Sequence, residues 1–138
     1  MRTALAGYLP FLAAALAVPA AAQAASSTCD GESIMAPQPG ITVVRSGSGH
    51  SATLTRTDED GAIHLEQHGR DHAALAVQSG DGSKLVIEQS GASAEADVTQ
   101  GGACNATELA QSGENNRAVV SQSGSGNRVV VRQGPSKE

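Results

Sequence analysis

Apolar and polar residues alternate with a period of two inside a longer period of eleven residues. From residue 45 to residue 133 the chain divides into eight units of eleven, without insertion or deletion. Each unit starts at a long polar residue, here called station zero, and carries mostly aliphatic or small residues at stations seven and nine. The zero stations are Arg45, Arg56, Gln67, Gln78, Gln89, Gln100, Gln111, Gln122 and Gln133. Gapless repetition predicts a stacked repeat architecture. It disfavours an enzyme, because an active site needs residues that occur once.

Stations five, seven, nine and eleven differ by two, so they share one face of a β-strand. Station two is a glycine, usually after serine, in every unit except the one that carries Asp58. These bend glycines are Gly47, Gly69, Gly80, Gly91, Gly102, Gly113 and Gly124. Glycine supplies the backbone freedom that a tight reversal needs. Each unit therefore predicts about seven strand residues followed by a bend.

An eleven-residue period also suits a right-handed helical coiled coil. A glycine in nearly every unit and the valine runs at 119–120 and 129–131 penalise a helix and favour strands. The pattern therefore predicts an all-β fold, a β-solenoid of stacked strand–bend–strand rungs with parallel, in-register ladders. Two units make one rung, so the eight units predict four rungs, spaced about 4.8 Å apart.

In such a stack each residue lies above its counterpart 22 residues away. The glutamines then form two columns, with Gln89, Gln111 and Gln133 in one and Gln78, Gln100 and Gln122 in the other. Stacked amides hydrogen-bond along a column, which satisfies buried polar groups that are costly when unpaired. We expect the self-assembly ladder to consist of these glutamines, Gln67, and the station-five residues Asn105, Asn116 and Asn127.

The ends of the predicted stack expose unpaired strand edges, which natural proteins usually block. The last unit, residues 122–133, is among the most regular, and Pro135 is at most a weak cap. An uncapped parallel stack is a template for another molecule, so the pattern predicts fibre formation.

Residues 1–24 are typical of a secretory signal peptide, with a basic start, a short apolar run and small residues that permit cleavage after Ala22 or Ala24. A leader over residues 25–44 carries proline and glycine and shows no strand or helix pattern, so we expect it to be flexible. The repeat array is expected over residues 45–133, and a C-terminal tail over residues 134–138.

Composition narrows the functional classes. Tyr8 and Phe11 are the only aromatic residues and lie in the signal segment, so the mature chain is stabilised without aromatic burial. Without Arg2, eight basic residues face fourteen acidic ones, which gives no reason to expect nucleic-acid binding. In an oxidising compartment Cys29 and Cys104 form a disulfide between leader and array, or they stay as free or intermolecularly paired thiols. The sequence leaves these alternatives open.

His64, His68 and His72 are spaced by four residues, which on a helix would suggest a metal site. In the strand register they fall outward, in a bend and at station five, so we expect no metal site. No nucleophile and base occur in a recognisable catalytic motif. We therefore expect no enzymatic activity, no cofactor and no small-molecule substrate.

The two C-terminal units, residues 111–122 and 122–133, have the form Q-x-G-x-x-N-x-[AV]-x-V-x-Q. This pattern resembles the curlin repeat of curli fibre subunits from Gram-negative bacteria. The resemblance implies a subunit that leaves the cell through a dedicated outer-membrane pore and polymerises at the cell surface into functional amyloid. It further implies a role in biofilm matrix and adhesion, and a leader that directs secretion.

As partners, the resemblance implies further copies of this chain, other curlin subunits and the outer-membrane secretion machinery. The family contains major subunits and minor, nucleating subunits, and the sequence does not decide between them. Arg45, Arg56 and Asp58 depart from the repeat and mark the N-terminal half as the weaker part. An alternative is a soluble, monomeric β-solenoid binding module, which an outward apolar row would favour. That row is Leu75, Val86, Val119 and Val130.

Overall fold

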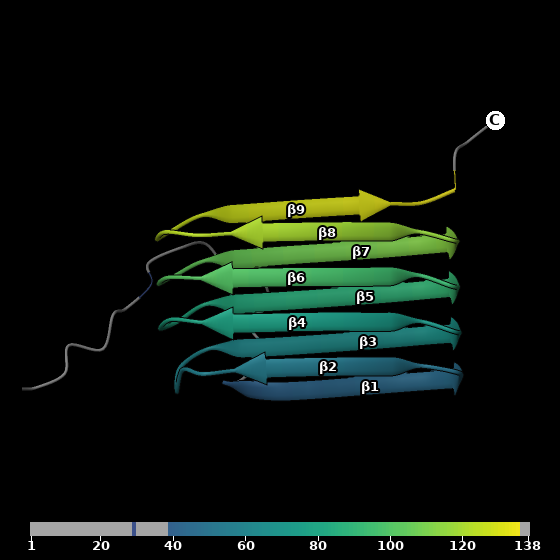
Figure 1. The fold of residues 1–138 in the computed structure, drawn as a ribbon, viewed down its shortest axis with the longest axis horizontal. Helices are drawn as coiled ribbons and strands as arrows, with labels where there is room; N and C mark the ends of the chain where they lie inside the picture. Colours follow the sequence, from purple (N-terminus) through teal and green to yellow (C-terminus); the bar gives the residue numbers. More distant parts are fainter. Residues whose placement is uncertain (1–28, 30–38, 136–138) are drawn as a thin grey trace, which may run out of the picture.

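The computed structural model describes Cys29 and residues 39–135, and these residues form nine strands and no helix. The strands are β1 (Gly40–Ser48), β2 (Ser51–Arg56), β3 (Ala62–Arg70), β4 (Ala73–Ser79), β5 (Lys84–Ala92), β6 (Glu95–Gly101), β7 (Ala106–Glu114), β8 (Arg117–Gln122) and β9 (Arg128–Gln133). Figure 1 shows them as one stack, in which the chain reverses direction at each bend and rises steadily from β1 to β9. The predicted all-β, parallel β-solenoid is confirmed.

The strands form two parallel sheets. One is five-stranded, with the order β1-β3-β5-β7-β9, and the other is four-stranded, with the order β2-β4-β6-β8. Each strand pairs in register with the strand 22 residues ahead, as Gln67 does with Gln89 and Gln78 with Gln100. Register follows from the sequence, because a shift by one residue would turn every inward side chain outward.

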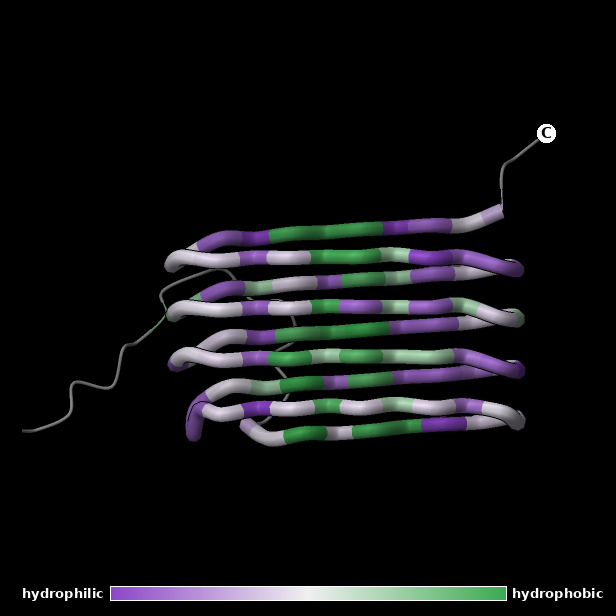
Figure 2. The backbone as a smooth tube through the Cα atoms, viewed as in Figure 1, coloured by the Kyte–Doolittle hydropathy of each residue, from purple (hydrophilic) through white to green (hydrophobic). Residues whose placement is uncertain are grey.

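The core lies between the two sheets and is built from stations seven and nine. Its largest members are Ile63, Leu65, Leu85, Ile87 and Leu109, all fully buried. They pack with smaller partners from the opposite sheet, such as the alanines of β4, β6 and β8. Figure 2 shows hydrophobic segments recurring near the middle of the strands, with polar residues toward the bends. Burial of each large aliphatic side chain contributes about 1.5–3 kcal/mol, which the stack obtains without aromatic residues.

The array starts earlier than the sequence indicated. Strand β1 begins at Gly40, whereas the leader was expected to reach residue 44. Ile41 and Val43 occupy stations seven and nine of a further strand and pair with Ile63 and Leu65. The reason is that each strand begins about five residues before its zero station, so Arg45 lies inside β1 rather than at the start of the array. The described stack is therefore four rungs plus one strand.

The bends at the two edges of the stack differ. Gly47, Gly69, Gly91 and Gly113 lie inside the bounds of β1, β3, β5 and β7, so ladder pairing continues through these bend glycines. At the other edge, β4, β6 and β8 end one or two residues before their bend glycines, which therefore lie outside the strands. His68, expected in a bend, accordingly lies within β3.

The expected signal peptide, residues 1–24, lies outside the described residues, as do residues 136–138 of the expected tail. Of the leader, only Cys29 and residues from 39 onward are described. Within the part of the chain that the structure describes, no helix is both long and apolar enough to cross a membrane.

Candidate self-assembly site

The first glutamine column runs through the five-stranded sheet and is continuous. It consists of Gln67, Gln89, Gln111 and Gln133. Each amide nitrogen donates to the amide oxygen one rung above, over 2.9 Å from Gln67, 3.1 Å from Gln89 and 2.9 Å from Gln111. At the lower end Arg45 Nε donates to Gln67 Oε1 over 3.0 Å, so the arginine starts the column. All donors point toward the C-terminal end of the stack.

The same amides also bind the facing strand. Gln89 Nε2 donates to the backbone oxygen of Ala73 over 3.1 Å, and Gln111 Nε2 to that of Glu95 over 3.1 Å. The side chains of Gln67, Gln89 and Gln111 are buried, while Gln133 at the top is half-buried. The column therefore ties the rungs vertically and the two sheets laterally, and it satisfies amides that would otherwise be costly to bury.

The second column, Gln78, Gln100 and Gln122 in the four-stranded sheet, is incomplete. Gln100 Nε2 donates to Gln122 Oε1 over 3.1 Å. Gln78, which is fully buried, has no hydrogen-bond partner for either amide atom, and neither Gln100 Oε1 nor Gln122 Nε2 has one. The expectation that the ladder pairs every buried glutamine is wrong for this column.

Asp58 accounts for the missing partner of Gln78 Oε1. Arg56 is the register partner of Gln78, but its Nη1 donates to Asp58 Oδ1 over 3.3 Å and to the backbone oxygen of Gly61 over 2.9 Å. Asp58 Oδ1 also accepts the backbone N–H of Gly61. The one bend without a station-two glycine thus draws the arginine away from the column. This agrees with the expected weakness of the N-terminal half.

Station-five side chains close the bends from inside. Asn105, Asn116 and Asn127 each donate Nδ2 to the backbone oxygen four residues earlier, over 2.9, 2.7 and 2.8 Å. Asn105 and Asn127 lie in one column, where Asn127 Nδ2 reaches Asn105 Oδ1 over 3.2 Å. Asn116 lies at the opposite edge of the stack. The three asparagines therefore do not form one ladder.

Two histidines occupy station five in place of asparagine, a role that the sequence reasoning missed. His50 Nε2 and His72 Nε2 contact the backbone oxygens of Ser46 and His68 over 3.1 and 3.0 Å, again four residues earlier. Their rings stack with centroids 5.1 Å apart. His72 Nδ1 accepts the backbone N–H of Ala94 over 3.2 Å. The common spacing to the bend carbonyl is the signal that could have revealed this.

Where another glycine lies one rung above, the bend glycines stack so closely that a side chain has no room. These residues are Gly47, Gly69, Gly80, Gly91 and Gly102. A Cβ on Gly69 would lie 2.0 Å from the backbone oxygen of Gly91, and one on Gly91 would lie 2.1 Å from that of Gly113. Their φ values, +124° and +103°, are also in the region that favours glycine. The glycine pattern thus serves the contact between rungs as well as the turn.

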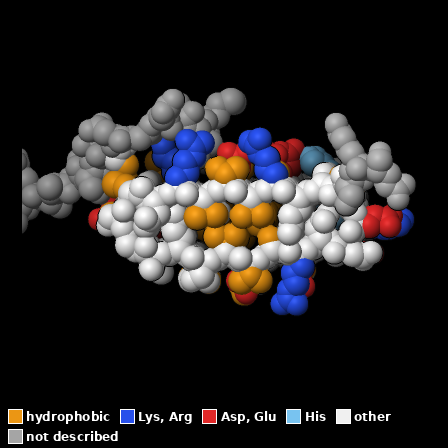
Figure 3. All heavy atoms as spheres, turned by 90° about the horizontal axis from the view of Figure 1, so that it is seen from above, with side chains coloured by type: hydrophobic (Ala, Val, Ile, Leu, Met, Phe, Trp, Pro, Cys, Tyr) orange, Lys and Arg blue, Asp and Glu red, His pale blue; other side chains and the backbone are white. Residues whose placement is uncertain are grey.

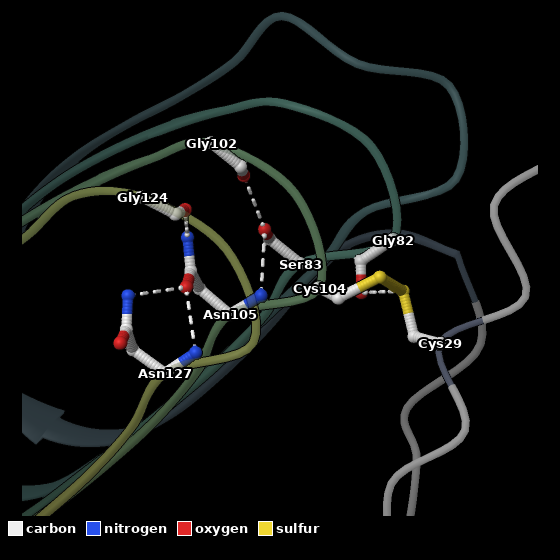
Figure 4. Close-up of a disulfide and its surroundings, with 8 residues drawn as sticks. All are labelled: Cys29, Gly82, Ser83, Gly102, Cys104, Asn105, Gly124 and Asn127. Carbon is white, nitrogen blue, oxygen red and sulfur yellow. Dashed lines mark hydrogen bonds between the residues drawn. A yellow bond between two sulfur atoms is a disulfide. The ribbon is translucent and has the colours of Figure 1, made fainter.

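Cys29 and Cys104 form a disulfide with a Cα–Cα distance of 5.3 Å, one of the two alternatives that the sequence left open. Cys104 lies in the β6–β7 bend at station four, with φ +57°, and its backbone N–H donates to the oxygen of Asp81 over 2.9 Å. Figure 4 shows the bond on the outer side of the bend, with Ser83, Asn105 and Asn127 on the inner side. The disulfide therefore attaches Cys29 of the leader to the bend and leaves the hydrogen bonds inside the bend intact.

The three histidines do not form one cluster. His64 and His68 both contact Glu66 on the outer face of β3, with His64 Nε2 at 4.0 Å from Glu66 Oε2, whereas His72 is buried at station five. Among the described residues no group of three or more histidine, cysteine, aspartate or glutamate side chains could hold a metal ion.

The prediction that the outward apolar residues form one row on a single surface is wrong. Leu75 and Val119 lie on the four-stranded sheet with Asp97 between them in register. Val86 and Val130 lie on the five-stranded sheet and are separated by Glu108. The eleven-residue spacing places successive units on opposite faces, which removes the main support for a binding module with a flat apolar face.

The most regular part of the stack is also the part that matches a known family. The model of the curlin associated repeat matches residues 102–134, which span β7, β8 and β9 with the bends that carry Asn105, Asn116 and Asn127. No curated protein matches the chain. The expected resemblance is confirmed for these residues. Residues 102–134 are therefore similar to the curlin associated repeat in sequence.

Proposed function

We propose that the chain is a secreted structural subunit that polymerises into extracellular curli-type amyloid fibres, which serve in biofilm matrix and surface adhesion. The observation that carries the proposal is the first glutamine column. Its hydrogen bonds run in one direction through the stack and reach Gln133 on β9, the outermost described strand of its sheet. A column of this kind is extended, rather than closed, by another parallel strand.

The two ends of the stack support the same proposal. At the lower end Ile41 and Val43 lie on the inward face of β1, in register with the buried Ile63 and Leu65. They are nevertheless 46% and 41% exposed, because no described strand lies below them. At the upper end Val129 and Val131 are only partly buried. Figure 3 views this end from above and shows hydrophobic side chains gathered in a band between the two strands. Both ends are therefore open cross-sections of the core, which a second copy would cover.

The remaining expectations fit this function. The Cys29–Cys104 disulfide is consistent with a location outside the cytoplasm. We propose that residues 1–24 direct export, that the following leader is read by the outer-membrane secretion machinery, and that the fibre lies on the surface of a Gram-negative bacterium. Other curlin subunits are the expected additional partners. The chain is proposed to have no enzymatic activity, cofactor or small-molecule substrate.

The test is assembly of the purified secreted chain. We expect pelletable fibres that bind an amyloid dye and diffract at about 4.8 Å along the fibre axis. Time courses with and without reductant separate the contribution of the disulfide. A chain that stays monomeric in sedimentation for days, with no cross-β diffraction, would contradict the proposal. Addition of seeds to a major curlin subunit, which would shorten that subunit's lag phase, distinguishes a nucleating role.

A further inference from the structure

The two sheets of the described stack contain different numbers of strands, so the five-stranded sheet forms the outermost strand at both ends. Nine strands are divided five to four, so β9 ends the five-stranded sheet above β8, which ends the four-stranded sheet. At the lower end β1 starts the five-stranded sheet and lies below β2, which starts the other. Figure 1 shows each strand lying above its predecessor along the stack, with the two sheets alternating. After β9, the next vacant position is above β8.

We propose that successive copies in the fibre are related by a half-turn about the stack axis, so that β1 of the next copy pairs with β8 and its β2 pairs with β9. This inference rests on the proposed function and specifies its interface. Each copy then advances the fibre by four and a half rungs, about 22 Å, and alternate copies present the disulfide on opposite edges of the fibre.

Stacking without the half-turn leaves a gap. If β1 of the next copy paired with β9, its β2 would lie two strand spacings above β8, about 9.6 Å away. One strand position in the four-stranded sheet would then be empty at every joint, and two strand edges would be left unpaired. Unpaired edges are the feature that drives strand addition, so this joint is the less stable one.

The half-turn joint continues the inward columns. Val43 of the next copy lies above Val120, and Ile41 lies above Ala118. In the other sheet Leu54 lies above Val131. These pairs cover the exposed ends of the core and maintain aliphatic contacts across the joint. The zero stations also remain aligned, with Arg45 above Gln122 and Arg56 above Gln133, the two uppermost glutamines of the columns.

The bend glycines distinguish the two joints independently. Within the stack, a glycine faces the backbone of another glycine one rung above, as Gly102 faces Gly124. The space above Gly124 is open, and the nearest atom to a Cβ there is its own neighbour Asn127 Nδ2 at 3.4 Å. The half-turn places Gly47 of the next copy above Gly124. Without it, Gly47 would lie above Pro135, which already covers Gly113.

Station five adds a third match. The backbone N–H of each upper residue donates to the side chain one rung below, from Asn105 to Ser83 Oγ over 3.2 Å and from Asn127 to Asn105 Oδ1 over 3.0 Å. The half-turn brings His50 of the next copy above Asn127, so its backbone N–H meets Asn127 Oδ1. The same hydrogen-bond pattern thus continues across the joint.

Cysteine cross-linking in fibres of the full secreted chain tests the joint. In-register neighbours in adjacent parallel strands lie about 4.8 Å apart at Cα, within the range of a disulfide. The double variant Thr53→Cys with Val130→Cys places both thiols on the outer face of one joint only after a half-turn. The double variant Thr42→Cys with Val130→Cys does so only without it. Single variants serve as controls, and peptide mapping verifies that Cys29–Cys104 is retained.

Covalent chains of the first double variant, after oxidation and dissolution of the fibres in denaturant without reductant, are the expected result. Cross-linking confined to the second double variant, or fibres in which neither double variant links, would overturn the half-turn joint while leaving the proposed function intact. A wild-type chain that forms no fibres at all would overturn the proposed function, and with it the joint.

A matched glycine pair provides a second measurement. Gly124→Ala adds a methyl group that has space in the subunit but meets the backbone of Gly47 of the next copy in the half-turn joint. Gly113→Ala has nearly the same φ, +97° against +93°, but Pro135 of the same chain lies above it. We expect Gly124→Ala to slow fibre elongation at least tenfold relative to Gly113→Ala. Equal elongation rates would contradict the proposed joint.

Discussion

At station five, two chemically different side chains satisfy the same backbone groups. Asparagine donates through Nδ2 to the bend carbonyl and accepts through Oδ1 from the rung above, as Asn105 does. His72 does the same with Nε2 and Nδ1, which requires the neutral ring with its proton on Nε2. The histidines therefore belong to the bend chemistry and are not evidence of a separate metal or catalytic function.

This equivalence makes His72→Asn and His72→Leu a diagnostic pair. His72→Leu removes both hydrogen bonds and leaves two buried backbone groups unpaired, so we expect a loss of about 2–3 kcal/mol in the free energy of unfolding. His72→Asn can restore both bonds, and its loss should be less than half as large. Urea unfolding of the unassembled chain, followed by circular dichroism, measures the two. A leucine variant as stable as the asparagine variant would contradict the bonding role.

At the scale of the element, the bend is fixed by contact between rungs as well as by local conformation. Positive φ recurs at station two, which is always glycine where it occurs, and at station four, where Asp71, Ser93, Cys104 and Asn115 adopt it. Station four tolerates a side chain. A glycine at station two with another glycine one rung above it does not, because its Cβ would point at the backbone of that rung. Conformation alone thus does not account for the glycine pattern.

Gly91→Ala and Gly113→Ala separate these two effects. Both residues have φ near +100° and would carry a similar conformational cost of about 1–2 kcal/mol as alanine. Only Gly91 would place its Cβ 2.1 Å from the oxygen above it. We expect Gly91→Ala to lower the free energy of unfolding by about 2 kcal/mol more than Gly113→Ala. Similar losses for both variants in urea unfolding would show that conformation, not stacking, requires the glycine.

At the scale of the whole molecule, the disulfide is a second covalent link between the leader and the array, in addition to the peptide backbone. It joins residues 75 positions apart and attaches in the β6–β7 bend, in the upper half of the stack. The segment between the cysteines contains β1 to β6, so the bond encloses the weaker N-terminal half, including Gln78 with its unpaired amide. The cross-link thus restrains the part of the stack in which the glutamine columns have unpaired amide groups.

Cys104→Ser should therefore destabilise the chain without changing its strands. The entropy of closing a loop of this length sets an upper limit of about 4.5 kcal/mol on the loss. The strand hydrogen bonds do not involve the sulfur, so the circular dichroism spectrum at low temperature should be unchanged while the thermal midpoint falls. Cys29→Ser is the matched control and should give the same shift. A midpoint equal to that of the wild type would contradict the restraint.

The sequence by itself determined the solenoid, its register and the inward face. These follow from parity and from a gapless period, which act along a single strand and repeat at each rung. The strand at residues 40–48 was missed because the unit that holds Ile41 and Val43 begins before Arg45, the first recognisable station zero, and has alanine instead of glycine at station two. The sequence also could not choose between paired and free cysteines, since that choice depends on where a remote leader lies in space.

Only the tertiary structure decided which polar groups meet. Gln78 and Gln89 have the same position in the repeat, yet Gln89 is bonded above and below and Gln78 is unpaired. For Gln78 Oε1 the difference arises because Arg56, its register partner, donates to Asp58 and Gly61 instead. Gln78 Nε2 also makes no hydrogen bond to Gln100 Oε1, the rung above. A periodic sequence specifies which residues are stacked, but hydrogen bonding also depends on the competing partners that the bends place within reach.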